Sequence, residues 1–153
     1  MELTIDQALQ QAVAAHREGK LQDAERLYRS VLQAQPKHPD ANHNLGVLAV
    51  AVGRSLEALP FFEQALGANS KVEQFWVSYI DALIKVDRLN EAREVLARGE
   101  QSGVSAENLA AFYQKLQVSV SKAANKVAKK QTLSEKRKRL TEKKKSKKLP
   151  FKI

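Results

Sequence analysis

A fixed 34-residue period constrains this chain more than any other feature of its sequence. Three stretches at this spacing begin with a turn-forming residue, which is Gly19, Gly53 or Asp87. A small residue and then a large residue follow at constant offsets, and the pairs are Ala24 with Tyr28, Ala58 with Phe62, and Ala92 with Leu96. A repeat of this length indicates a stack of similar supersecondary units that share one continuous core.

The spacing has a direct physical explanation if each unit is a pair of antiparallel helices. Two helices that pack closely need a side chain no larger than a methyl group at their contact, and the alanine of each stretch provides it. The large residue lies one turn further along the same helix face and fills the space beside the contact. The glycine or aspartate tolerates the positive φ that ends the first helix. The sequence therefore predicts an all-α fold.

This pattern resembles the tetratricopeptide repeat, and the resemblance extends from residue 1 to about residue 104. Leu45-Gly46 matches the Leu-Gly pair of that family's first helix, and Pro36 matches its closing proline. The resemblance implies a right-handed α-solenoid of three helix–turn–helix units, at about 5–38, 39–72 and 73–104. A capping helix at about 105–118 completes a domain spanning residues 1–118, because the last apolar face of a solenoid needs a cover.

The helix boundaries follow from local signals. Thr4-x-x-Gln7 resembles a capping box, and Pro39 suits the first turn of a helix. Pro60 lies inside a predicted helix, where we expect a bend and not a break. Gly103 is expected to stop one helix, and Ser105-x-x-Asn108 to start the next. The other helices are expected at 21–34, 40–52, 71–86 and 89–101.

The net charge of +9 conceals a division of the chain into two parts. Residues 1–118 hold 12 Lys or Arg against 15 Asp or Glu, whereas residues 119–153 hold 14 against 2. Such an asymmetry marks a domain boundary and an interaction tail or linker. Because the lysine-rich segment 119–153 has little apolar surface to bury, we predict that it is mostly disordered.

Composition argues against several classes of function. The chain has no cysteine and no apolar run near the roughly 18 residues of a transmembrane helix. The start of the chain lacks the features of a signal peptide, so a cytoplasmic protein is expected. Its three histidines, His16, His38 and His43, lack the spacing of a metal-binding helix, and there is no glycine-rich phosphate loop. We therefore predict no enzymatic activity, no cofactor, no metal and no small-molecule substrate.

The family resemblance implies a binding groove lined by the first helix of each unit, which accepts a peptide or a helix of another protein. Packing against a neighbouring helix is the alternative role for the apolar members, and we favour it for Val13, Val47 and Val77. The candidate groove residues by register are Leu9, Gln10, His16, Arg17, His43, Asn44, Val47, Gln74, Ser78, Asp81 and Lys85. Of these, we expect His43, Asn44 and Asp81 to be exposed in the groove.

Two subfamilies allow a closer comparison. Chaperone-binding members hold a terminal carboxylate with lysines, an arginine and asparagines. Here only Asn44 matches, and the other clamp positions hold Leu9, Val13, Gln74 and Ser78. Capture of a chaperone C-terminus is therefore not expected.

The repeats of O-linked N-acetylglucosamine transferases present a ladder of asparagines to the peptide backbone. Asn44 matches that ladder, which Gln10 and Ser78 interrupt. The segments 38–48 and 75–80 also resemble N-terminal repeats of bacterial glycosyltransferases. An alternative function is thus the recruiting domain of a larger glycosyltransferase-like enzyme, continuing beyond Ile153.

The basic tail leaves three interpretations open. It neutralises nucleic-acid phosphates without sequence specificity, it lies on anionic lipid, or it is a solvated linker. The residues that would contact a polyanion are Lys136, Arg137, Lys138, Arg139, Lys143, Lys144, Lys145, Lys147 and Lys148.

Overall fold

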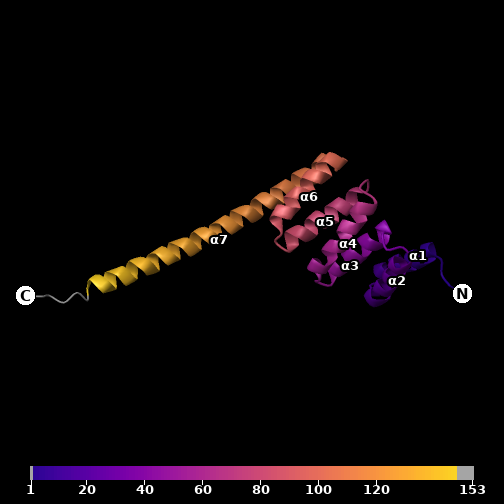
Figure 1. The fold of residues 1–153 in the computed structure, drawn as a ribbon, viewed down its shortest axis with the longest axis horizontal. Helices are drawn as coiled ribbons and strands as arrows, with labels where there is room; N and C mark the ends of the chain where they lie inside the picture. The colour runs from indigo at the N-terminus through magenta and orange to yellow at the C-terminus, as the bar shows by residue number, and fades with distance from the viewer. Residues whose placement is uncertain (1, 148–153) are drawn as a thin grey trace, which may run out of the picture. The chain divides into compact units, whose positions relative to one another are not determined.

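A computed structural model describes residues 2–147 of the chain, except the side chains of residues 119, 120 and 123. This part contains seven helices (Figure 1), and residues 2–147 include no strand. The helices are α1 (Ile5–Arg17), α2 (Leu21–Ala34), α3 (Pro39–Ala51), α4 (Ser55–Ala68), α5 (Glu73–Lys85), α6 (Leu89–Ser102) and α7 (Ala106–Ser146). The chain divides within α7 into two compact units, residues 1–113 and 114–153.

The first unit contains three helix pairs, α1 with α2, α3 with α4, and α5 with α6, and the first helices α1, α3 and α5 contact one another in turn. The predicted boundaries agree with the observed ones to within about two residues. Thr4 forms the predicted capping box, in which its hydroxyl accepts a hydrogen bond from the Gln7 amide at 3.2 Å. Pro39 occupies the first turn of α3, and His38 caps that helix by accepting a bond from the Ala41 amide.

The turns within the helix pairs adopt the left-handed conformation that the sequence predicts. The φ angles of Gly19 and Gly53 are 75° and 81°, and that of Asp87 is 62°. Gly103 ends α6 in the same conformation, with a φ of 93°. Aspartate tolerates this conformation better than most residues other than glycine, which explains why it replaces glycine in the third stretch.

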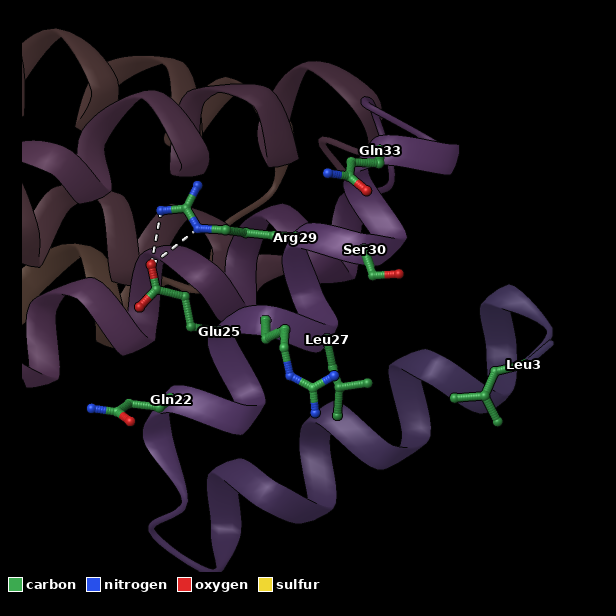
Figure 2. Close-up of a pocket in the computed structure, with 8 residues that line it drawn as sticks. Leu3, Gln22, Glu25, Leu27, Arg29, Ser30 and Gln33 are labelled. Carbon is green, nitrogen blue, oxygen red and sulfur yellow. Dashed lines mark hydrogen bonds and ion pairs between the residues drawn. The ribbon is translucent and has the colours of Figure 1, made fainter. Parts of the chain in front are cut away.

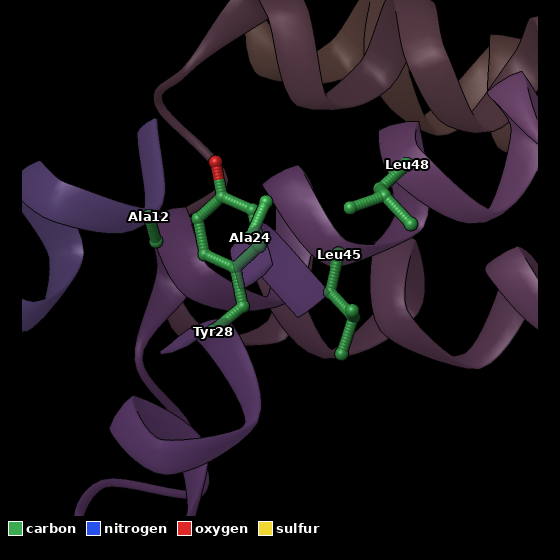
Figure 3. Close-up of a cluster of buried hydrophobic side chains, with 5 residues drawn as sticks. All are labelled: Ala12, Ala24, Tyr28, Leu45 and Leu48. Atoms are coloured by element: carbon green, nitrogen blue, oxygen red, sulfur yellow. The ribbon is translucent and has the colours of Figure 1, made fainter. Parts of the chain in front are cut away.

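The close helix contacts are also as predicted. Ala24, Ala58 and Ala92 are fully buried, and so are the large residues Tyr28, Phe62 and Leu96 that accompany them. Figure 3 shows one of the resulting clusters, where Ala12, Ala24 and Tyr28 of the first pair meet Leu45 and Leu48 of α3. The core is therefore continuous from the first helix pair to the second, as a stacked array requires.

The loops that connect the helix pairs are held by a repeated hydrogen bond. Asn42 donates its side-chain amide to the Pro36 carbonyl at 3.1 Å. Trp76, 34 residues later, donates its indole N–H to the Ser70 carbonyl at 2.9 Å. Two different residue types therefore make the same bond at the same register position. Pro60 lies inside α4, which continues through it, so the helix is not broken there.

In the second unit, the structure corrects one expectation. The segment from residue 119 was predicted to be mostly disordered, but α7 is helical to Ser146. Lysine, arginine, alanine, glutamate and glutamine have high intrinsic helix propensity and dominate this segment. No glycine or proline interrupts it before residue 147. Local backbone preference thus supports a helix even though few apolar side chains are available to bury.

Candidate functional site

The first helices of the second and third pairs enclose a small pocket. Its volume is about 140 Å³, and it opens to solvent. The lining residues are Val47 and Val50 of α3, Phe62 of α4, and Ser78, Asp81, Ala82 and Lys85 of α5. The structure therefore brings together four of the predicted groove residues, Val47, Ser78, Asp81 and Lys85. We call this feature the first-helix pocket.

The walls of the first-helix pocket differ in chemistry. Val47, Val50 and Phe62 form an apolar wall, and Ser78, Asp81 and Lys85 supply polar groups along α5. A cavity of roughly 150 Å³ lined by apolar side chains accepts a group of about the size of benzene. The pocket therefore has room for one apolar side chain with polar atoms beside it.

His43 is not exposed in the groove as predicted, and this expectation is wrong. Its imidazole is buried, stacks on the Phe75 ring with 4.7 Å between ring centroids, and lies 5.7 Å from the Phe62 ring. These two rings come from α5 and α4, so His43 packs between adjacent helix pairs. An apolar environment on both sides disfavours the charged imidazolium, so the ring is buried in its neutral form.

A row of polar side chains connects α3 with α5 at this interface. Gln74 donates to the Ser78 hydroxyl at 3.3 Å, and that hydroxyl lies 2.9 Å from His43 Nε2. His43 Nδ1 lies 3.4 Å from the Asn44 side-chain oxygen. Both hydrogen bonds of the His43 ring are made when the neutral imidazole accepts from the Ser78 hydroxyl at Nε2 and donates from Nδ1 to the Asn44 oxygen. Burial also lowers the pKa of His43, which favours the same neutral form.

The groove candidates on α1 do not join the first-helix pocket. Leu9 and Val13 pack against the cluster around Tyr28, so packing is the role that the structure supports for Val13. His16 Nδ1 lies 3.4 Å from the Tyr28 hydroxyl. The side chains of Gln10 and Arg17 are exposed. Asn44 and Val77 on the other first helices are half-buried, and Gln74 is exposed.

A larger open hollow of about 640 Å³ lies along α2 (Figure 2), and it shares no lining residue with the first-helix pocket. Leu3 and Leu27 contribute to it, but most of its lining is polar. Glu25 accepts a hydrogen bond from Arg29 at 2.8 Å, which lowers the pKa of the Glu25 carboxyl. Because this hollow is a broad, charged surface, the smaller pocket with a distinct apolar wall is the better candidate for specific binding.

Sequence reasoning missed two features of this region. Phe62 and Ala82 line the pocket although their register positions assign them to helix packing. Glu73 accepts hydrogen bonds from the Ser105 amide at 2.8 Å and the Asn108 side chain at 2.9 Å, so it caps the start of α7. Hydrogen bonding by the Ser105 side chain, the Asn108 side chain and the Ser105 amide lowers the pKa of the Glu73 carboxyl. No pattern local to Glu73 indicates partners more than 30 residues away.

The predicted polyanion-binding residues from Lys136 to Lys147 are exposed, while Lys148 lies outside the described residues. Within residues 2–147, no cluster of three or more His, Asp or Glu is placed to hold a metal ion. None of the described helices is both long enough and apolar enough to span a membrane.

Comparison with known proteins agrees with this architecture. Two family models of the tetratricopeptide repeat match residues 9–73 and 49–116. No curated protein matches the chain. These matches do not single out glycosyltransferase repeats, so that resemblance stays a prediction.

Solved structures share the fold at low sequence identity. The Sgt2 TPR domain from Aspergillus fumigatus is 18% identical, with a TM-score of 0.69 over 79% of this chain and 82% of that one. The first TPR of Spaghetti (RPAP3) bound to an HSP90 peptide is 15% identical, with a TM-score of 0.67 over 74% and 90%. The TPR2B domain of yeast Sti1 in complex with Hsp70 is 16% identical, with a TM-score of 0.67 over 74% and 95%. The family models, which together span residues 9–116, and the stacked helix pairs show that this chain belongs to the tetratricopeptide-repeat family.

Proposed function

We propose that this protein is a non-catalytic interaction module that binds a peptide or helix of a partner protein on the face formed by α1, α3 and α5. The observation that carries the proposal is the first-helix pocket, where an apolar wall from α3 meets polar groups on α5. Clefts that combine apolar walls with a few placed polar groups are typical of binding sites. The HSP90 peptide bound to the Spaghetti domain supports a peptide as the ligand class, and the pHsp70 complex of the Sti1 domain supports a protein partner.

The array itself fits three repeats followed by a cap. Each helix pair supplies one repeat, and the first turns of α7 follow the third pair. Val104, just before α7, and Phe112, in its second turn, are buried. A covered end of this kind is what a short solenoid needs to remain soluble.

The side chains present favour an apolar anchor over a terminal carboxylate. The clamp positions of chaperone-binding repeats, other than the one that Asn44 matches, hold Leu9, Val13, Gln74 and Ser78 here. Leu9 and Val13 pack against the core, and the Ser78 hydroxyl already bonds with His43 and Gln74. None of these groups offers the positive charge that a carboxylate requires. The expected ligand therefore inserts an apolar side chain between Val47 and Val50, and polar groups of the ligand meet Asp81 and Lys85.

A peptide selection on the full-length chain tests this proposal. Random peptides displayed on phage are selected on the immobilised protein, and the affinities of the selected sequences are then measured in solution. We expect a shared apolar residue among them and at least about a tenfold loss of affinity with Val50→Asp, since anchor positions dominate binding energy. The matched control is Gln64→Asp, an exposed change on α4 outside the pocket.

The stability of each variant is measured by thermal unfolding, so that a folding defect in Val50→Asp is not mistaken for lost contact. If that variant unfolds, Lys85→Glu provides a second test at the rim of the pocket. Peptides that bind all pocket variants with unchanged affinity would contradict the assignment of the site.

A further inference from the structure

The second half of α7 carries charge of nearly one sign. Residues 122–146 contain eleven Lys or Arg and only two acidic residues, Glu135 and Glu142. The side chains described in this stretch are all exposed. None of its cations forms an ion pair within the described part of the chain. The helix therefore presents unneutralised positive charge to solvent.

The cations are not spread evenly around the helix. At about 100° per residue, eight of the eleven fall within an arc of about 140°. We call this arc the basic face, and its cations are Lys122, Lys126, Lys129, Lys130, Lys136, Arg137, Lys143 and Lys144. Leu133 and Leu140 lie within the same arc. Both glutamates lie on the opposite side.

The glutamates balance only the cations outside the basic face. Lys138, Arg139 and Lys145 each stand three or four residues from Glu135 or Glu142, which is the spacing of neighbours on a helix surface. No cation of the basic face has an acidic residue at that spacing. Like charges at this spacing destabilise a helix, and an external polyanion would relieve that repulsion.

We propose that the basic face of α7 binds the phosphate backbone of double-stranded DNA without sequence specificity, a role separate from peptide binding by the repeats. The face runs from residue 122 to residue 144, about 33 Å along the helix, which gives one cation every ~4 Å. Each DNA strand presents one phosphate per ~3.4 Å of axis. A helix of about 10–12 Å diameter also fits the roughly 12 Å major groove of B-form DNA.

The same residues fit other polyanions less well. A helix that inserts into a membrane surface needs a broad apolar face with aromatic residues or leucines. Residues 114–147 contain no aromatic residue, and the basic face has only two leucines. Double-stranded RNA has a deep, narrow major groove that does not admit such a helix. Sequence-specific readout is not expected because the face carries a single amide side chain, Asn125, among its eight cations.

Matched charge variants of the full-length protein test the proposal. The first variant combines Lys136→Gln, Arg137→Gln and Lys144→Gln on the basic face. The second combines Lys138→Gln, Arg139→Gln and Lys145→Gln on the opposite side. Each removes two lysines and one arginine from the same segment, so the two proteins have the same net charge. The binding of a fluorescent 20-base-pair DNA duplex is measured by anisotropy across a range of salt concentrations, and circular dichroism monitors helix content.

We expect the first variant to lose at least about tenfold in DNA affinity and to reduce the salt slope by about 2 to 3, since each phosphate contact contributes ~0.9. The second variant should lose less than about threefold. Equal losses in both variants would show a response to net charge alone and would overturn the proposal, as would absence of binding at about 50 mM salt. Tighter binding to a duplex RNA of equal length, or to phosphatidylserine vesicles with sensitivity to Leu133→Gln, would also overturn it.

Discussion

The aromatic ring of Phe62 occupies the space that a side chain at Gly46 would need. A Cβ atom at Gly46 would lie 2.7 Å from Phe62 Cε1, which is closer than two non-bonded carbon atoms approach each other. The two residues belong to α3 and α4, so the missing side chain sets how closely these helices pack. The register partners of this pair, 34 residues before and after, are Ala12 with Tyr28 and Ile80 with Leu96. In the third helix pair, Ile80 on the first helix is larger than its counterpart Gly46. Leu96 on the second helix is smaller than its counterpart Phe62.

Gly46→Ala is expected to destabilise the protein by about 1–3 kcal/mol, because the added methyl group displaces a buried ring. Gly67→Ala is the matched control. Gly67 lies on α4, and a methyl group there would meet no atom within 4 Å, so alanine should be neutral or stabilise by up to ~1 kcal/mol. Chemical denaturation of both variants measures the difference. Similar effects at both sites would contradict the packing described for Phe62.

Ala58→Leu tests the register of the repeats themselves. Ala58 is fully buried between the helices of the second pair, and three additional carbon atoms there should overpack the contact and cost about 1–3 kcal/mol. Gln64→Leu introduces the same side chain at an exposed position of the same helix and should change stability little. The unfolding free energies of the two variants are compared by urea titration. Equal losses would mean that the assigned helix faces are incorrect.

The sequence predicted the helix pairs closely because their signals are local and repeat. Turn residues, capping residues and the spacing of alanine with a large residue fix each element independently of its neighbours. The bond shared by Asn42 and Trp76 was not predictable in this way. Both donate to the carbonyl six residues earlier, but one is an amide and the other an indole. A pattern of residue types does not reveal an equivalence of hydrogen-bond donors.

The candidate site and the tail were predicted less completely than the helix pairs. Register identifies which helix face a residue occupies, but not how far a neighbouring helix covers it. His43 lies on the expected face and is nevertheless buried by Phe62 and Phe75. The helical tail was not predicted because low apolar content is typical of disorder, whereas the helix propensity of its lysines and alanines favours a helix. The capping of α7 by Glu73 depends on tertiary contact and has no local signal.

Glu73→Gln is expected to lower the thermal midpoint at neutral pH. The Glu73 carboxylate accepts two hydrogen bonds at the start of α7, and a neutral amide accepts them more weakly. Hydrogen bonding by Ser105, through its side chain and its amide, and by the Asn108 side chain depresses the pKa of Glu73 in the folded protein. Its contribution is therefore complete above the pKa of the unfolded chain, about 4.3, and is lost as pH falls through the lower folded pKa. Scanning calorimetry from pH 7 to pH 3 should show the difference between wild type and variant shrinking. Glu94→Gln, an exposed change on α6, should leave the neutral-pH midpoint nearly unchanged.

The buried imidazole of His43 should make the free energy of unfolding depend on pH. This dependence falls at higher pH than the titration of Glu73. Burial lowers the pKa of His43 in the folded protein, whereas the unfolded chain has the ordinary value of about 6.5. Between these two values the unfolded state binds more protons, so the folded state loses stability as pH falls below about 6.5. The slope from one such group is at most about 1.4 kcal/mol per pH unit.

Urea unfolding of the wild type at pH 7.5, 6.5 and 5.5 measures this slope. His43→Gln should reduce it, whatever the variant costs in stability at pH 7.5, because glutamine does not titrate. If that variant does not fold, proton NMR of the wild type provides the second measurement. The His43 ring resonances should then titrate below pH 6.5, because burial lowers the pKa of His43. A His43 that titrates at or above that value would show that its stacking on Phe75 and its bond to Ser78 do not favour the neutral form.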